Sequence, residues 1–322
     1  MLSPTALPFE VRTDVPLRGF TSLKAGGPAD WLGIARTVDD LAAAASWAQS
    51  EAVATTYLGW GSNILPADAG VGGLVLINGA RTIQVSSSGD VTADAGAGYQ
   101  ELFLKTAQAG LNGLEFAVGI PGTIGGALVS NAGAYRSCIS EFLTELEVVF
   151  EGKRQWVEPA FMEFGYRDSI LRRPNPPSVA ILQVRMKMPK GKPKEIYDEG
   201  REYQRQRISK QPPPASAGSF FKNVNDAVLA QTLDDLPGPL KVKGIVPAGY
   251  LIQRAGLMGT RIGGAMLSRR HANFVLNVGG ATATEIRTLT DHAKAVVHQT
   301  FGVSMEEEVL FLGRWENWDG LA

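Results

Sequence analysis

The sequence has little of what most redox and metal chemistry in proteins uses. Cys138 is the only cysteine among 322 residues, which excludes an internal disulfide and any site built from several cysteines. The three histidines, His271, His292 and His298, all lie late in the chain, and the spacing of the last two does not place both on one face of a helix. We therefore expect no metal site, and any redox activity needs an organic cofactor.

Charge and hydropathy exclude two further classes of partner. The net charge of −1 gives no electrostatic footprint for nucleic acid or an anionic membrane surface, and no apolar run is long enough to span a bilayer. Residues 1–15 carry neither a basic leader nor an apolar stretch, so we expect a cytoplasmic protein. The composition, 44% hydrophobic and 20% charged, is typical of globular proteins, and the length predicts two or three domains. No pattern indicates an oligomeric state.

Periodicity predicts a chain of mixed helices and strands. Helices are expected at 38–51, 99–109, 195–208, 227–233, 248–255 and 282–301, and strands at 55–58, 74–77, 91–95, 146–150, 180–188, 274–278 and 305–312. Prolines and lysines gather at 188–194, which indicates a domain junction. The run Pro212-Pro213-Pro214 ends the charged helix that follows, because proline cannot continue a helix.

The segment from Gly113 to Tyr135 is the most informative in the chain. Glycines punctuate an almost uncharged stretch whose gaps are filled by apolar residues such as Ile120 and Ile124. Glycine permits positive φ and close approach, and consecutive amides freed in this way hold phosphates. The spacing gives neither the Gly-x-Gly-x-x-Gly dinucleotide pattern nor a Walker loop. Two interpretations remain: a phosphate-bearing ligand, or a tight structural turn inside a β-rich core.

A second glycine cluster follows the strand expected at 55–58. Gly59, Gly61, Ser62 and Asn63 offer backbone amides, a hydroxyl and a side-chain amide to an oxyanion. A plain turn between strands has the same composition. A diphosphate held by backbone donors needs no lysine nearby, so two uncharged loops in one half of the chain are consistent with such a ligand.

Two further motifs carry groups suited to charge stabilisation and proton transfer. Arg167 follows Tyr166 and is suited to stabilise an oxyanion, although a surface turn with Asp168 explains the same residues. Ser219 lies on a constrained turn before two aromatic residues and can give or take a proton. It is no nucleophile elbow, because Gly-x-Ser-x-Gly is absent.

An acidic triplet precedes the last apolar run. Strand alternation predicts that Glu306 and Glu308 share one face and that Glu307 lies on the other. Glu308 leads directly into Val309, so we expect it to be the most buried of the three, as carboxylates in sites often are. Exposed acids at the start of an edge strand are the alternative.

Together these motifs resemble the UDP-N-acetylenolpyruvoylglucosamine reductase family, in the family's order and over nearly the whole chain. The resemblance rests on residues 21–30, 58–65, 113–135, 165–169, 218–221, 248–277 and 308–309. It implies an α+β protein with an FAD-binding fold of the p-cresol methylhydroxylase type and a separate α/β substrate domain, which accounts for the absent dinucleotide motif. Residues 1–190 would then form the FAD-binding region, with subdomains at about 1–70 and 71–190. Residues 200–303 would bind substrate, and 304–322 would return to the active site as a closing strand.

The resemblance also implies an activity. FAD, bound non-covalently, would take electrons from NADPH and reduce UDP-N-acetylglucosamine enolpyruvate to UDP-N-acetylmuramate for peptidoglycan synthesis. Arg167 and Glu308 match the residues that stabilise the developing negative charge, and Ser219 matches the proton donor. The implied FAD-binding residues are Gly59, Gly61, Ser62, Asn63, Gly119, Gly122, Thr123, Gly125, Gly126, Asn131, Ala132, Gly133 and Tyr166. The candidates for gripping the sugar nucleotide are Lys210, Asn223 and His271.

Departures from the family pattern and other functions bear on the substrate. Some members carry a lysine just before the segment that begins at Ala248, where this chain reads Ile245-Val246-Pro247 with Lys243 upstream. The short stretch between Tyr166 and Ala180 has no counterpart of the tyrosine-bearing substrate loop, which suggests the family branch with a more open uridine site. One alternative is another FAD oxidoreductase of this fold acting on a sugar or hydroxy acid. Another is a non-catalytic nucleotide-binding protein, which would not need the three catalytic candidates together.

Overall fold

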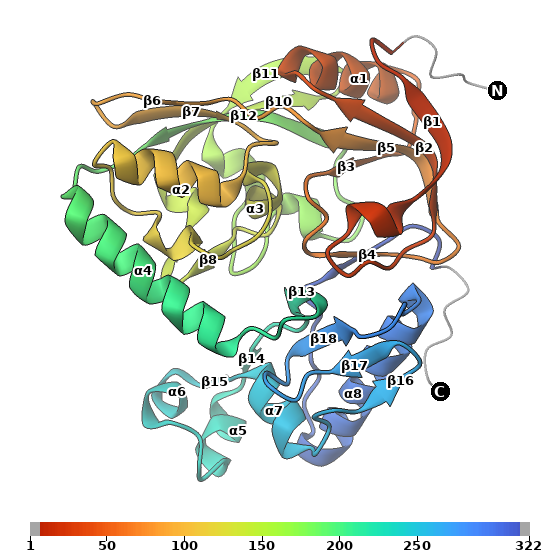
Figure 1. Ribbon diagram of the computed structural model, residues 1–322, viewed down its shortest axis with the longest axis vertical. Helices are drawn as coiled ribbons and strands as arrows, with labels where there is room; N and C mark the ends of the chain where they lie inside the picture. The colour runs from red at the N-terminus through yellow and green to blue at the C-terminus, as the bar shows by residue number, and fades with distance from the viewer. Residues whose placement is uncertain (1–6, 316–322) are drawn as a thin grey trace. The chain divides into compact units, whose positions relative to one another are not determined.

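The computed structural model describes residues 7–315 and divides the chain into two compact units (Figure 1). The first unit contains the described residues up to Val15, together with Ala29–Trp60 and Gly72–Ser209. The second contains Pro16–Pro28, Gly61–Val71 and the described residues from Lys210 onward. Two short early segments of the chain therefore belong to the same unit as its last third.

The largest sheet of the first unit has five antiparallel strands and is buried on both faces. Its order is β11 (Lys153–Val157), β10 (Leu143–Phe150), β12 (Val179–Lys187), β7 (Asp90–Asp94) and β6 (Ile83–Val85). Val149 and Leu182 lie in one core cluster with the alanines of α1 (Val38–Ser50), whereas Val148 and Val184 lie in another with α2 (Tyr99–Gln108). This alternation follows from the pleat of a strand, which points successive side chains to opposite faces.

A second sheet packs against the same face of α1 in the first unit. Its order is β1 (Val11–Pro16), β2 (Pro28–Ala35), β5 (Val71–Asn78) and β3 (Thr55–Leu58), with β3 and β5 parallel. Leu74 and Leu76 of β5 join Leu41 and Ala45 of α1 in one core cluster. Thr37 caps α1, because its hydroxyl accepts a hydrogen bond from the amide of Asp40 and the Asp40 side chain accepts from the amide of Thr37.

The long helix α4 (Pro193–Lys210) lies beside α2 (Figure 1). A side chain at Gly200 would lie 2.7 Å from the ring of Phe103, so the glycine lets the two helices approach closely. Ile196 is buried in the same core as α2. Ile196 and Gly200 thus fix the first half of α4 against the rest of the unit. In its second half, Tyr203 stacks on Tyr135 and Arg207 donates to the carbonyl of Phe116, so this part of α4 lies at the glycine-rich segment.

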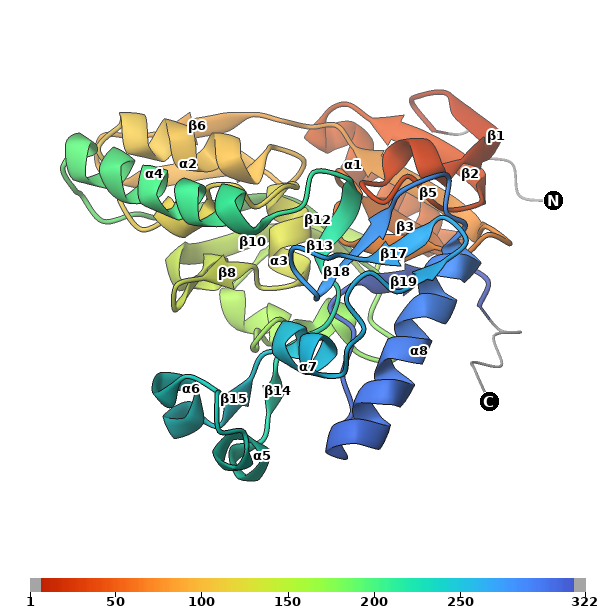
Figure 2. The ribbon, with the colours of Figure 1, turned by 60° about the horizontal axis from the view of Figure 1, so that its bottom comes forward.

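The second unit is built on a sheet of four short antiparallel strands. Its order is β13 (Ala215–Ser219), β18 (Phe274–Asn277), β17 (Ala265–Leu267) and β16 (Arg261–Ile262). The helices α7 (Ala248–Arg254) and α8 (Ala283–Phe301) share its core, which buries Leu251, Leu289 and Val297 completely. A small group of elements, β14 (Val224–Asn225), β15 (Ile245–Val246), α5 (Ala227–Thr232) and α6 (Gly238–Lys243), lies together beyond α7 (Figure 2).

The expected helices and most expected strands are confirmed, but the closing strand is shorter than predicted. Only Leu310–Leu312 forms a strand, β19, which pairs in parallel with β4 (Ile64–Pro66). The residues before β19 form backbone hydrogen bonds with the segment after β13 instead. The predicted strand over 305–312 is therefore wrong for its first five residues. Within the described part of the chain, no helix is both long and apolar enough to cross a membrane.

Candidate active site

The glycine-rich segment is a folded loop with two helical turns. The first is a 3-10 turn over Glu115–Ala117, and the second is the short helix α3 (Ile124–Val129). Thr123 caps α3, because its hydroxyl accepts a hydrogen bond from the amide of Gly126. Gly119 and Gly122 have φ of 77° and 130°, values that side-chain-bearing residues rarely adopt. The loop therefore has a defined shape that requires glycine at these two positions.

Several amides of this loop already have partners inside the protein. The amide of Ile124 donates to the carbonyl of Ala97 at 2.9 Å, and that of Gly125 donates to Ala95 at 2.7 Å. The amide of Gly126 is taken by Thr123. An anion at this loop would therefore be held by amides other than these three.

Within the first unit, Gly59 of the second glycine cluster lies directly against the glycine-rich segment. A side chain at Gly59 would lie 2.2 Å from the hydroxyl oxygen of Thr123, the residue that starts α3. Only a glycine at position 59 permits this approach. In the second unit, Gly61 has φ of 60° and would place a side chain 2.0 Å from the carbonyl oxygen of Phe20, so that turn also depends on glycine.

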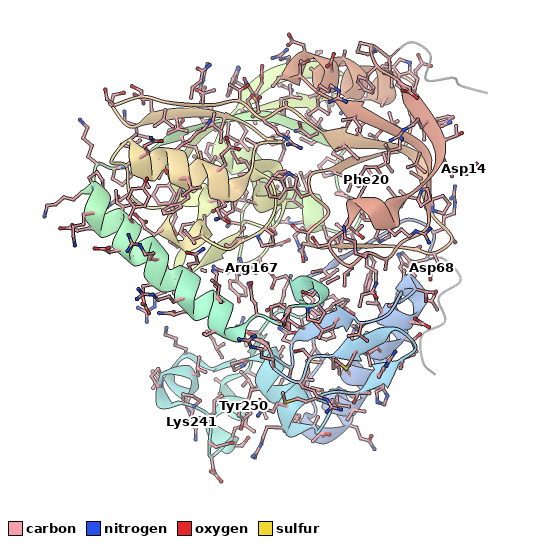
Figure 3. All side chains as sticks on the ribbon, in the orientation of Figure 1. Asp14, Phe20, Asp68, Arg167, Lys241 and Tyr250 are labelled. Carbon is pink, nitrogen blue, oxygen red and sulfur yellow. The ribbon has the colours of Figure 1, made fainter. Side chains whose placement is uncertain are left out.

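Arg167, labelled in Figure 3, lies on a tight turn that hydrogen bonds attach to the end of α3. The amide of Gly165 donates to the carbonyl of Asp168 at 3.0 Å, and Arg167 itself has φ of 53°. The side-chain amide of Asn131 donates to the carbonyl of Gly165, and the buried hydroxyl of Ser169 donates to Val129. Arg167 is half-buried on this anchored turn, unlike Tyr166, which is exposed.

Arg207 of α4 is a further cation at this place, and sequence reasoning missed it. Its guanidinium donates to the carbonyl of Phe116 at 3.0 Å and lies over the ring of Tyr135, while its side chain covers Gly119. Burial lowers the pKa of Arg207, and the nearby positive charge of Arg167 lowers it further. In the sequence Arg207 is one of several charged residues on a helix, and no local signal separates it from the exposed ones.

The hydroxyl of Tyr99, at the start of α2, is a second polar group of this region that the sequence analysis did not single out. Its side chain is completely buried, and its hydroxyl has no hydrogen-bond partner within residues 7–315. Burial raises the pKa of Tyr99, and the charges of Arg167 and Arg207 act on it in the opposite sense. A buried hydroxyl without a partner costs free energy, which is relieved when a ligand supplies the missing acceptor or donor.

In the second unit the structure brings Ser219 next to the acidic triplet. Phe220 follows Ser219, and its carbonyl accepts hydrogen bonds from the amides of Glu308, at 2.8 Å, and Val309, at 3.4 Å. The amide of Lys222 donates to Glu306. The side-chain amide of Asn63 donates to the carbonyl of Glu308, so one of the expected loop residues also fixes this segment.

The three acids have different surroundings. Glu306 pairs with Lys222 and Glu307 with Lys294, at 2.5 and 2.7 Å. The prediction that Glu306 and Glu308 share a strand face is wrong, because the strand begins only at Leu310 and the period-two alternation does not apply to these acids. Glu308 is partly buried, directly before the buried Val309.

The expected sugar-nucleotide residues are spread over the second unit. Asn223 is exposed and follows Lys222. The His271 ring lies 4.8 Å from that of Phe274, and its backbone amide donates to the hydroxyl of Ser268. Lys210 ends α4, and its side chain falls outside the described part of the chain.

Comparison with known proteins gives the family. Residues 208–312 match the UDP-N-acetylenolpyruvoylglucosamine reductase C-terminal domain, and residues 30–156 match the FAD binding domain. The reductase of Synechococcus sp. (strain JA-3-3Ab) is 36% identical over 95% of this chain and 93% of its own length, and that of Bacillus subtilis is 35% identical over 94% of each. The crystal structure of the Thermus caldophilus enzyme covers 94% of this chain and 98% of its own, with a TM-score of 0.74 and 30% identity.

These matches confirm the expected FAD-binding fold, and the relatives give no support to another sugar or hydroxy-acid oxidoreductase. The chain belongs to the UDP-N-acetylenolpyruvoylglucosamine reductase family.

Proposed function

We propose that this protein reduces the enolpyruvyl group of UDP-N-acetylglucosamine enolpyruvate to the lactyl ether of UDP-N-acetylmuramate, in the cytoplasm, as a step of peptidoglycan synthesis. NADPH is the proposed electron donor. The observation that carries the proposal, beside family membership, is the pairing of Ser219 with Glu308 through the carbonyl of Phe220. A proton donor and an acid are thereby held on adjoining segments of one unit.

The residues present fit a flavin dinucleotide. Gly59 packs against Thr123 without room for a side chain, so backbone lines this loop, and the buried Tyr99 hydroxyl lies within the influence of two arginines with its own hydrogen bond unmade. FAD, when bound, supplies two-electron hydride chemistry between NADPH and the substrate. We assign its binding to residues 1–190, with subdomains at about 1–70 and 71–190.

Within that region, the proposed FAD contacts span the two glycine clusters and the turn that carries Arg167. They are Gly59, Gly61, Ser62, Asn63, Gly119, Gly122, Thr123, Gly125, Gly126, Asn131, Ala132, Gly133 and Tyr166. Because the amides of Gly125 and Gly126 are bonded internally, these two residues would let the cofactor come close to the backbone but would not donate hydrogen bonds to it. The same holds for the Asn131 side chain, which bonds Gly165 and Ser140.

The proposed catalytic roles follow from the charge that the reaction creates. Hydride addition at the terminal vinyl carbon leaves an electron pair on the neighbouring carbon, and this pair spreads into the carboxylate as an enediolate. Arg167 supplies a positive charge for it, and Glu308 in its protonated form donates a hydrogen bond. The Ser219 hydroxyl then gives its proton to the neighbouring carbon, which completes the lactyl group.

Substrate binding is assigned to residues 200–303, with 304–322 as the closing segment. Lys210 and His271 would hold the diphosphate and uridine parts, and Asn223 would donate from its side-chain amide. The chain reads Ile245-Val246-Pro247 where some members carry a lysine. Lys210, Asn223 and His271 would therefore contribute more of the binding of the sugar nucleotide.

The function is tested by separating the two halves of the reaction. Purified protein is loaded with FAD and reduced anaerobically with NADPH, and UDP-N-acetylglucosamine enolpyruvate is then added while the flavin absorption band is followed. Bleaching followed by recovery is expected. Bleaching without recovery would retain the flavoprotein and reject the substrate, and the absence of a flavin band after FAD addition would reject the assignment altogether.

A further inference from the structure

Asn273, directly before β18, makes three hydrogen bonds to the segment after β13. Its carbonyl accepts from the amide of Phe220 at 2.7 Å. Its side-chain oxygen accepts from the amide of Phe221 at 2.9 Å, and its side-chain nitrogen donates to the carbonyl of Phe221 at 2.8 Å. Asn273 is only 4% exposed, so water does not compete for these bonds.

The side chain of Asn273 takes the place of a strand partner. The pairing of β13 with β18 carries a bulge between Ser216 and Ser219, with Gly218 at φ of 78°, and regular pairing ends where Ser219 meets Phe274. A bulge re-aims the side chains that follow it and interrupts the ladder. A side-chain amide has both a donor and an acceptor, so Asn273 satisfies the backbone amide and the carbonyl of Phe221, which lies beyond the end of the ladder.

The same short segment carries the Glu308 contact on its other side. The carbonyl of Phe220 accepts from the amide of Glu308, while the amide of Phe220 donates to Asn273. Phe221 also forms an isolated bridge with Glu307. Both phenylalanine side chains are 1% exposed, so the segment is fixed by packing and by hydrogen bonds from two directions.

We propose that Asn273 is a positioning residue for proton delivery: it clamps the peptide after Ser219 and so sets where the Ser219 hydroxyl and Glu308 lie relative to each other. Asn273 does not itself touch the reacting atoms in this scheme. The inference rests on the proposed function, because it assigns Asn273 to the substrate half-reaction. It also makes a structural claim about residues 219–222 and 306–309 that does not depend on the substrate.

The test compares Asn273, which directly precedes β18, with Asn277 at the end of that strand. Asn277 also binds backbone with its side chain, donating to Leu23 and accepting from Gly279 and Ala281, but it makes none of these bonds to residues 219–222. Asn273→Asp keeps the size and one acceptor while removing the donor to Phe221. Asn277→Asp is the control for the loss of a side-chain donor to backbone, at a partly buried position. Asn273→Leu removes both side-chain bonds of Asn273.

In FAD-loaded protein, Asn273→Asp is expected to leave flavin reduction by NADPH within about twofold of the wild type. It should slow reoxidation by the enolpyruvyl substrate about tenfold to a hundredfold, because misplaced catalytic groups lose rate steeply. The loss should fall on the maximal reoxidation rate rather than on the substrate concentration at half-saturation. Asn277→Asp should change neither the rate of flavin reduction nor the rate of reoxidation. Equal loss in both half-reactions, or the same split in Asn277→Asp, would overturn the inference.

A structural measurement decides the claim separately from the substrate. Hydrogen–deuterium exchange of peptides covering residues 215–223 and 304–312 should speed up together in Asn273→Asp and stay unchanged in Asn277→Asp. Faster exchange with normal reoxidation would reject the catalytic role. Unchanged exchange would reject the clamp. A wild-type protein that fails to reoxidise with the enolpyruvyl substrate would reject the proposed function, while exchange would still report on the clamp.

Discussion

The amide of Glu308 donates a hydrogen bond to the carbonyl of Phe220 at 2.8 Å. Because Phe220 follows Ser219 directly, this bond fixes the backbone of the proposed acid beside that of the proposed proton donor, although 89 positions separate the two residues in the sequence. A catalytic pair held by backbone contacts keeps its place when either side chain is replaced. Substitutions at either position should therefore report on chemistry rather than on folding.

The first prediction concerns Ser219→Ala. The variant should reduce its flavin with NADPH at the wild-type rate but reoxidise with substrate at least about a hundredfold more slowly, because general acid catalysis contributes about that much or more. Stopped-flow absorbance measures both half-reactions. Ser216→Ala, on the same strand before the bulge, is the control and should retain both rates. A parallel loss of both half-reactions in Ser219→Ala would remove Ser219 from proton transfer.

The second prediction separates Glu308 from its acidic neighbours. Glu308→Ala should slow reoxidation about a hundredfold to a thousandfold, the cost of one lost donor to developing negative charge. Glu308→Gln should lose less, because its amide still donates a hydrogen bond. Glu307→Gln removes only the ion pair with Lys294 and should leave the reoxidation rate unchanged. The assignment fails where Glu307→Gln slows reoxidation as much as Glu308→Ala does.

Features with short-range causes could be predicted from the sequence. The apolar periodicity over 282–301 predicts a helix, with Thr282 or Thr284 as its cap and Gly302 as its stop. In the structure Thr282 and Glu285 form a reciprocal capping box, and Gly302 ends α8 with φ of 71°. Each of these contacts joins residues within a single turn, so the local pattern contains its cause. The same holds for α1, which Thr37 and Asp40 cap in the same reciprocal way.

Features with long-range causes could not be predicted. Arg207 reaches the glycine segment across 91 positions, to the carbonyl of Phe116, and Asn273 reaches Phe221 across 52. The expected strand at 305–312 failed for a similar reason, since the amides of Glu308 and Val309 bond the carbonyl of Phe220, which is distant in the sequence. The roles of Arg167, Ser219 and Glu308 came from family resemblance, and their places in the fold come from the structure.

The third prediction concerns the contact between the two glycine clusters. Gly59→Ala places a methyl group 2.2 Å from the hydroxyl oxygen of Thr123, which must move and release its bond to Gly126. We expect a loss of about 1–3 kcal/mol in stability and a protein that does not retain FAD on gel filtration. In Gly126→Ala the added methyl group meets Thr123 at 3.5 Å, an ordinary contact, so the melting temperature should hold and any change in FAD affinity reports on the cofactor itself. Wild-type stability and FAD content in Gly59→Ala would contradict the close approach.

The fourth prediction concerns Asp68, which lies at the start of α8 (Figure 3). Its carboxylate accepts hydrogen bonds from the amides of Ala283 and Thr284 and from the hydroxyl of Thr284, at 2.7 to 2.9 Å. The first amides of a helix have no partner within the helix, and a negative charge there interacts favourably with the helix dipole. Asp68 thus attaches the segment from 61 to 71 to the longest helix of the second unit.

Removing this attachment should destabilise the second unit. Asp68→Ala is expected to lower the free energy of unfolding by about 1–2 kcal/mol, the cost of a lost helix cap. Asp68→Asn keeps an acceptor oxygen but loses the charge, so it should lose about half as much. Urea denaturation of the three proteins measures the order. If Asp68→Asn were as unstable as Asp68→Ala, the negative charge alone would carry the effect, because both variants lack that charge. If neither variant differed from the wild type in stability, water would satisfy the amides of α8 equally well, and Asp68 would not hold the segment.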